Sequence, residues 1–93
     1  MFDVTEVQRR LGVRVRMRRA QLGLTQHALA ARSGFSRPSI ANVEAGRQNV
    51  TLRQLCAVAG ALQLDVAELV ALALIAPEPV SGVVVAGSDA VTA

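Results

Sequence analysis

The chain has 93 residues, 52% of them hydrophobic, with two phenylalanines and no tyrosine or tryptophan. This length allows one small domain whose core must be built from aliphatic side chains. A single cysteine, Cys56, excludes a disulfide framework within the chain and fits a reducing compartment.

Positive charge is concentrated in the middle of the chain. All ten basic residues are arginines, and all lie between Arg9 and Arg53, where Glu44 is the single acid. The flanking segments carry only acids. A basic block inside a folded domain is typical of a protein with a polyanionic partner. The alternative is an arginine-rich helix surface that is merely solvated.

The first helix is expected to begin near Asp3 or Thr5, since each is followed three residues later by an acid or amide in a capping pattern, Glu6 after Asp3 and Gln8 after Thr5. Gly12 weakens this helix by about 1 kcal/mol relative to alanine, which suggests a close packing contact. Gly23 is expected to end it in the left-handed conformation. One face of the helix is apolar and consists of Val7, Leu11, Val15 and Leu22.

Two short helices are expected next. Thr25 is placed to cap a helix over residues 25–33, and Gly34 supplies a tight turn. Ser36 is placed to cap the following helix, which has Pro38 in its first turn, where a missing N–H is tolerated. Two short helices around such a turn are the layout of a helix-turn-helix, whose second helix enters the major groove of DNA.

Two further helices complete the pattern. Gly46 ends the third helix, and the pairs Thr51–Gln54 and Asp65–Glu68 are capping patterns that predict the fourth and fifth. The fourth helix is expected to bury Leu52, Leu55, Cys56, Val58, Ala59 and Leu62. The apolar positions of the fifth are Val66, Leu69, Val70 and Ala73.

The end of the chain is predicted to form a tail over residues 77–93. Pro77 and Pro79 end the last helix, and residues 81–87 have the pattern of a short strand. This strand either pairs with its twin across a dimer axis or belongs to a disordered tail. The fifth helix has more apolar residues than one core stripe requires. The predicted dimer interface comprises Leu69, Leu72, Ile75, Val83, Val84 and Val85.

A membrane span is not expected. The apolar run over residues 66–76 is interrupted by Glu68 and is too short to cross a bilayer, and no signal peptide is recognisable. We therefore expect a cytoplasmic protein. His27 has no cysteine or acid cluster near it, so neither a metal site nor another cofactor is expected.

Residues 11–70 resemble the lambda-repressor-like helix-turn-helix family, which includes phage repressors, Cro proteins and XRE-type regulators. The individual motifs are weak, but their order and spacing together are specific. Together with the pattern of five helices and a tail, the resemblance predicts an all-α, five-helix lambda-repressor-like domain over residues 1–76, followed by a short extended tail. It is carried by Val15, Arg16, Arg19, Gly23, Leu24, Thr25, Gln26, Leu29, Ala30, Gly34, Ser36, Ile40, Glu44, Gly46, residues 49–52, Leu55, Ala59, Leu62, Glu68 and Leu69.

The same resemblance implies which residues contact DNA. Arg37, Pro38 and Asn42 are expected to read bases, with arginine suited to guanine, asparagine to adenine and proline to a thymine methyl group. The alternatives are a phosphate contact for Arg37 and simple solvent exposure for Asn42. Phosphate contacts are expected from Thr25, Gln26, Ser36, Ser39, Arg47, Gln48 and Asn49. Gln26 is also expected to brace Arg37.

Arg19 and Glu44 are expected to form a structural ion pair between the first and third helices. As the single acid in the basic block, Glu44 would repel phosphate if its carboxylate were exposed on the binding face. A buried pair of this kind adds little net stability, but the loss of one partner is costly. The resemblance therefore assigns this acid to the scaffold.

The function that these patterns imply is a sequence-specific regulator of transcription that binds double-stranded DNA. We expect a dimeric repressor on a palindromic operator. The alternative is an antitoxin-like interaction module, in which the fifth helix and the tail bind a partner protein and DNA binding is secondary. An enzyme is not expected, because His27 and Cys56 fall in different helices and no paired carboxylates or phosphate-binding glycine loop are present.

Overall fold

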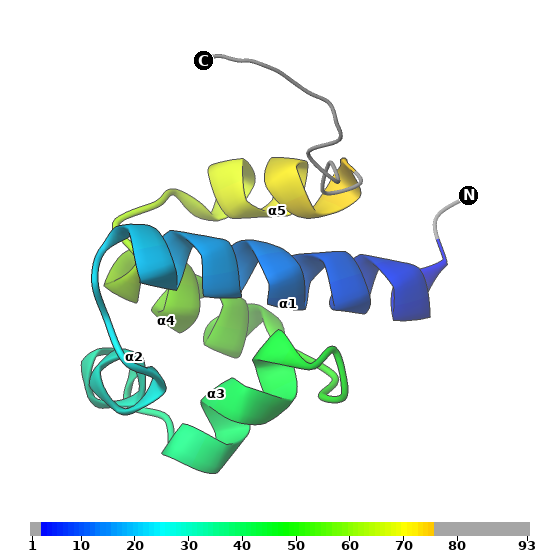
Figure 1. The fold of residues 1–93 in the computed structure, drawn as a ribbon. Helices are drawn as coiled ribbons and strands as arrows, with labels where there is room; N and C mark the ends of the chain where they lie inside the picture. Colours follow the sequence, from blue (N-terminus) through cyan, green and yellow to red (C-terminus); the bar gives the residue numbers. More distant parts are fainter. Residues whose placement is uncertain (1–2, 76–93) are drawn as a thin grey trace, which may run out of the picture.

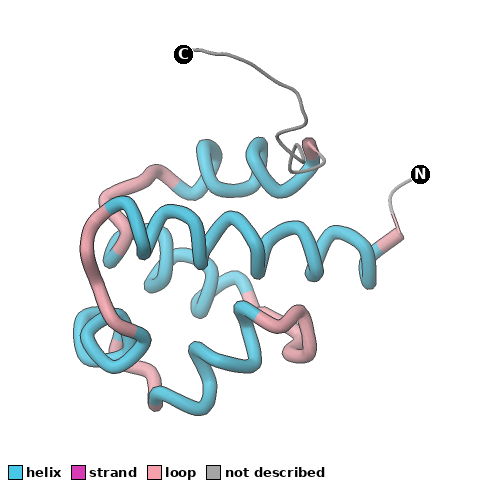
Figure 2. Tube along the Cα trace, viewed as in Figure 1, coloured by secondary structure: helices cyan, strands magenta, loops and turns pink. Residues whose placement is uncertain are grey.

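The computed structural model describes residues 3–75, and the fold of this part is all-α, as predicted (Figures 1 and 2). The predicted strand and its valines Val83, Val84 and Val85 lie outside the described residues. Five helices are present: α1 (Val4–Gln21), α2 (Gln26–Ser33), α3 (Arg37–Glu44), α4 (Leu52–Ala61) and α5 (Val66–Leu74).

The long helix α1 organises the domain. It packs against α5 on one side and against α3 on the other, while α2 packs against both α3 and α4 (Figure 1). All five helices contribute aliphatic side chains to one core, which fits the near absence of aromatic residues. The buried core residues are Leu11, Val15, Leu29, Ala30, Ile40, Val43, Val58, Ala59, Leu62, Leu69 and Ala73.

Local capping explains where the helices begin. Of the two candidates for α1, Asp3 is the N-cap, and its carboxylate accepts a hydrogen bond of 2.9 Å from the backbone N–H of Thr5. Thr51 and Gln54 form the complete capping box predicted for α4. The remaining N-caps are also the predicted ones, namely Thr25, Ser36 and Asp65.

Gly12 and Gly34 fix how the helices meet. A Cβ atom at Gly12 would lie 2.5 Å from the backbone oxygen of Glu44, so α1 and α3 cross here backbone to backbone. This is the close contact that the sequence predicted. Gly34 has a φ of +79° and forms the turn between α2 and α3, a conformation that L side chains rarely adopt.

Three apolar residues occupy positions that differ from expectation. Leu52 is 72% exposed and Cys56 is also exposed, although both were predicted in the core. Leu52 is the first residue of α4, where the helix projects beyond the core, and Cys56 lies one residue (about 100°) round the helix from Leu55. Leu69 was predicted at a dimer interface, but its side chain is fully buried within the core.

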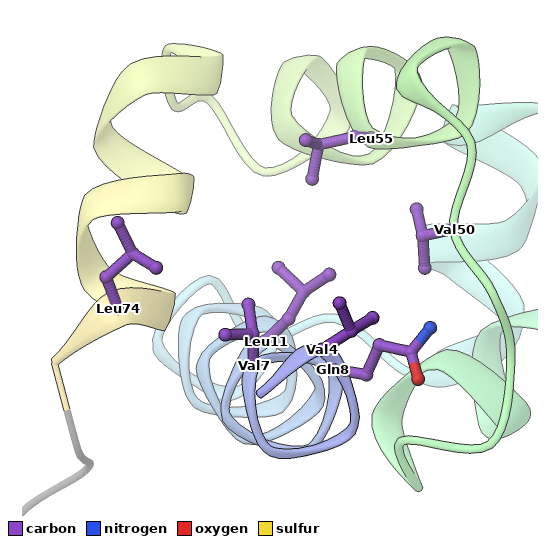
Figure 3. Close-up of a pocket in the computed structure, with 7 residues that line it drawn as sticks. All are labelled: Val4, Val7, Gln8, Leu11, Val50, Leu55 and Leu74. Carbon is purple, nitrogen blue, oxygen red and sulfur yellow. The ribbon is translucent and has the colours of Figure 1, made fainter. Parts of the chain in front are cut away.

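An apolar groove of about 330 Å³ opens at the end of the bundle where α1 begins and α5 ends (Figure 3). Apart from Gln8, its lining is aliphatic: Val4, Val7, Leu11, Val50, Leu55 and Leu74.

Within residues 3–75 no single helix is long and apolar enough to cross a membrane. Helices α4 and α5 would satisfy that test only as a pair, across a bend of 102°.

Candidate nucleic-acid interface

The three residues predicted to read bases lie on the outer surface of α3. Arg37, Pro38 and Asn42 are all exposed, whereas Ile40 and Val43 on the opposite side of the same helix are buried. This division follows from helical periodicity, because residues three and four apart share a face. The first turn of α3 therefore presents the guanidinium of Arg37 to the outside, and the next turn presents the carboxamide of Asn42, while the opposite side of the helix packs against the core.

The side chain of Gln26 connects the first turn of α3 to the scaffold. Its Oε1 atom accepts a hydrogen bond of 3.1 Å from Nη1 of Arg37, the brace expected from the resemblance. Its Nε2 atom donates to Oε1 of Glu44, also at 3.1 Å. The carboxamide of Gln26 thus forms hydrogen bonds with both Arg37 and Glu44. The orientation of the Arg37 side chain is therefore coupled to the position of a carboxylate on the inner side of α3.

Arg19 and Glu44 form the predicted ion pair. Nε of Arg19 lies 2.6 Å from Oε2 of Glu44, and Nη2 donates to Oε1 at 3.0 Å, which is the bidentate geometry of a strong charge-assisted pair. The third nitrogen of Arg19 donates to the backbone oxygen of Leu24. The Glu44 side chain is only 4% exposed, and its hydrogen bond raises the pKa of Arg19. The acid in the basic block is thus neutralised inside the fold.

The residues expected to contact phosphate gather at two places. Thr25 and Ser36 begin α2 and α3, and Ser39 accepts a hydrogen bond of 3.0 Å from the hydroxyl of Ser36. Exposed N–H groups and the positive end of the helix dipole make such N-termini suitable for anions. Arg47, Gln48 and Asn49 lie in the loop between α3 and α4. Oδ1 of Asn49 accepts a hydrogen bond of 2.6 Å from Gln8 of α1, a tether that was not foreseen.

Three arginines of α1 donate to the ends of other helices. Arg10, Arg14 and Arg18 recur every four residues on one face of α1, and each donates to a backbone oxygen near the C-terminus of another helix. Carbonyls in the last turn of a helix have few or no helical partners and lie at the negative end of its dipole; of these three, the oxygen of Leu72 also accepts from the backbone N–H of Ile75 at 3.3 Å. The acceptors are the oxygens of Leu74 for Arg10 (3.2 Å), of Leu72 for Arg14 (3.1 Å) and of Leu62 for Arg18 (2.9 Å).

This row of arginines changes the interpretation of the basic block. The charge pattern as a whole was read as a footprint for a polyanion, yet Arg10, Arg14 and Arg18 stabilise the ends of α4 and α5 instead. The spacing of four residues is visible in the sequence and predicts that the three share a face. What that face contacts depends on the tertiary packing.

Glu6 has a role different from the predicted one. Its carboxylate accepts hydrogen bonds from Arg9 and Arg10 on the next turn of α1. These hydrogen bonds lower the pKa of Glu6 from 4.5 to about 2. The capping pattern had paired this residue with Asp3. Two guanidinium groups within one turn attract a carboxylate more strongly than a single backbone N–H does.

Residues 10–72 match the model of a helix-turn-helix domain family. The chain belongs to this family. The match covers all of α2 to α4 and most of α1 and α5, so it includes every residue of the network around Glu44. The resemblance to lambda-repressor-like regulators of the Cro and XRE type is thereby confirmed.

Individual relatives agree with this assignment. The uncharacterised HTH-type transcriptional regulator y4dJ of Sinorhizobium fredii is 44% identical over 52 residues, 56% of this chain and 68% of that protein. The restriction-modification controller protein C.AhdI of Aeromonas hydrophila superposes with a TM-score of 0.65 at 37% identity, over 67% of this chain and 94% of that one. The clp gene regulator ClgR of Corynebacterium glutamicum gives a TM-score of 0.70 at 32% identity, over 73% and 87% of the two chains. This helix-turn-helix protein is a transcriptional regulator.

Proposed function

We propose that this regulator binds a specific sequence of double-stranded DNA with α3 in the major groove. The observation that carries the proposal is the hydrogen bond that holds the exposed Arg37 against Gln26 at the first turn of α3. A long side chain that is held in one orientation before binding loses less conformational entropy on contact with a base. Arg37 is therefore preorganised for recognition.

Base recognition is assigned to three side chains. Arg37 is suited to bidentate contact with O6 and N7 of guanine, and Asn42 to N6 and N7 of adenine. Pro38 offers an apolar surface to a thymine methyl group. Arg37 and Asn42 are five residues apart on α3, so they address different base pairs of one half-site.

Phosphate contacts are assigned to both edges of this surface. Thr25, Gln26, Ser36 and Ser39 lie at the first turns of α2 and α3, where backbone N–H groups have no helical partners. The loop after α3 provides the other edge, with Arg47, Gln48 and Asn49. Phosphate contacts on both sides of α3 fix the register of this helix in the major groove of DNA. Such contacts carry no sequence information.

The regulator is further proposed to act as a homodimer on a palindromic operator and to repress transcription. Support comes from the end of α5, where Leu72 and Ile75 are 36% and 57% exposed. Val4 of α1 is 67% exposed, and together with Leu74 of α5 it lines the apolar groove of about 330 Å³. A contact between copies would bury these apolar side chains, and a palindromic operator requires the two recognition helices to lie about 34–36 Å apart. Leu69 is excluded from that interface by its burial in the core.

The decisive experiment is selection of bound duplexes from a random library, followed by affinity measurements on Arg37→Ala and Arg47→Ala. Arg37→Ala should cost about 1–3 kcal/mol on the selected duplex and relax the preference at one base pair. Arg47→Ala should weaken binding to all duplexes equally and reduce the salt dependence. Equal losses for both variants on selected and random DNA would remove Arg37 from the base-reading set.

The assembly is tested separately by sedimentation of the purified protein with and without DNA. We expect a dimer, and a selected motif that consists of two inverted half-sites. A protein that stays monomeric on a single half-site would overturn the dimer. A stable complex with a second protein through α5 and the tail, with only secondary binding of DNA, would favour the antitoxin-like alternative instead.

A further inference from the structure

Helix α1 carries six arginines, and Arg16 differs from the other five. Arg10, Arg14 and Arg18 donate to carbonyls of α4 and α5, while Arg9 and Arg19 pair with Glu6 and Glu44. The guanidinium of Arg16 makes no hydrogen bond or ion pair with any residue between 3 and 75, and its side chain is exposed. Its position on α1 also differs, because it points away from the row of Arg14 and Arg18.

Arg16 lines a hollow of about 290 Å³ between α1 and α3. Helix α3 contributes Glu44 and the small residues Ala41 and Ala45 to its wall, and the two alanines leave the space open. The acid in its wall, Glu44, is already neutralised by Arg19 and by the amide of Gln26. With Arg16 included, the side chains around the hollow carry one net positive charge.

The hollow lies beside the residues proposed to read bases. Gln26 forms part of its wall and at the same time holds Arg37. Arg37, Ala41 and Ala45 follow one another at intervals of four residues, so they share one flank of α3. A helix about 10–12 Å in diameter fills a major groove about 12 Å wide, so its flanks face the sugar-phosphate strands.

We propose that this hollow receives a phosphate of the DNA backbone and that Arg16 donates to it. The inference rests on the proposed binding of α3 in the major groove and adds a contact from α1, a helix to which the sequence assigned no contact with DNA. A phosphodiester carries one negative charge, which matches the net charge of the hollow. Arg16 then anchors the flank of α3 and reads no base.

Two alanine variants of α1, each of which removes one positive charge, test the contact. Arg16→Ala should weaken binding to the selected duplex and to a random 30-base-pair duplex alike, on the order of three- to tenfold. It should also reduce the slope of log Kd against log salt by about 1. Arg14→Ala removes the same charge from the opposite face, and it should lower Tm without changing that slope. Arg16→Lys should keep most of the slope.

Ethylation interference identifies the phosphate directly. Ethylation of one phosphate in each half-site should impair binding of the wild-type protein and have no effect on Arg16→Ala. Salt slopes that are equal for Arg16→Ala, Arg14→Ala and the wild type would overturn the contact, as would a changed base preference in Arg16→Ala. If the wild-type protein bound no duplex at all, the proposed function would fail together with this inference. Wild-type binding that is unaffected by Arg16→Ala rejects the phosphate contact alone.

Discussion

The two long faces of α1 use the same residue type for different purposes. On the face toward α4 and α5, Arg10, Arg14 and Arg18 bind backbone carbonyls at the ends of those helices. On the face toward α3, Arg19 neutralises a buried carboxylate, and Arg16 lines a hollow beside the helix proposed to read DNA. One face therefore contributes mainly stability, and the other connects the scaffold to the DNA-binding surface.

This contrast shows that the number of basic residues overestimates a binding surface. A guanidinium that already donates to a carbonyl at a helix end has less to offer a phosphate, because it would have to give up an existing partner. The arginines to be assigned to DNA are those whose nitrogen atoms remain available on the side of α3.

The largest effect is expected on the face toward α3. Glu44→Ala should lower the free energy of unfolding by about 3–5 kcal/mol, because it leaves the Arg19 guanidinium largely buried without its carboxylate. Urea unfolding followed by circular dichroism measures this loss. The double variant Arg19→Met/Glu44→Leu should lose less, since neither charge then remains. An unchanged midpoint combined with an altered base preference would mean that Glu44 belongs to the reading surface instead.

A smaller loss is expected on the opposite face. Arg18→Ala should lower the free energy of unfolding by about 1–2 kcal/mol, because the carbonyl of Leu62 at the end of α4 loses a charged donor. Arg18→Met, which keeps the aliphatic packing but not the charge, should lose less than the alanine variant. Both proteins should bind DNA with the wild-type salt slope once folded. A reduced slope would show that this face also contacts phosphate.

The sequence predicted the parts of the fold that depend on neighbouring residues. N-caps such as Thr25 and Ser36 were located correctly because a cap acts within a single turn. The close approach at Gly12 was also predicted, since a glycine inside a helix needs a packing reason. The pairing of Arg19 with Glu44 was obtained from the family resemblance, because the two residues lie 25 positions apart.

The positions and contacts that the sequence did not predict depend on tertiary packing. Leu52 has the right helical phase for the core but stands at the first turn of α4, beyond the end of the packed region. On α5, the acceptors for Arg10 and Arg14 are backbone oxygens, which any residue possesses and which therefore leave no sequence signal. The contribution of Arg16 to a hollow depends on the crossing of α1 and α3 and was likewise not visible in the sequence.

The smallest effect concerns Glu6, which holds Arg9 and Arg10 at the start of α1. Its pKa is lowered from 4.5 to about 2 by these hydrogen bonds, so its stabilising contribution is present above pH 4.5 and disappears as the pH falls toward 2. The wild type should therefore melt above Glu6→Gln at pH 6, and the difference in Tm should close at pH 2. Because the carboxylate is exposed, added salt should reduce the difference at pH 6. A difference in Tm that is independent of pH would mean that Glu6 stabilises the protein by packing and not by its charge. Arg10 would then be held by the carbonyl of Leu74 alone.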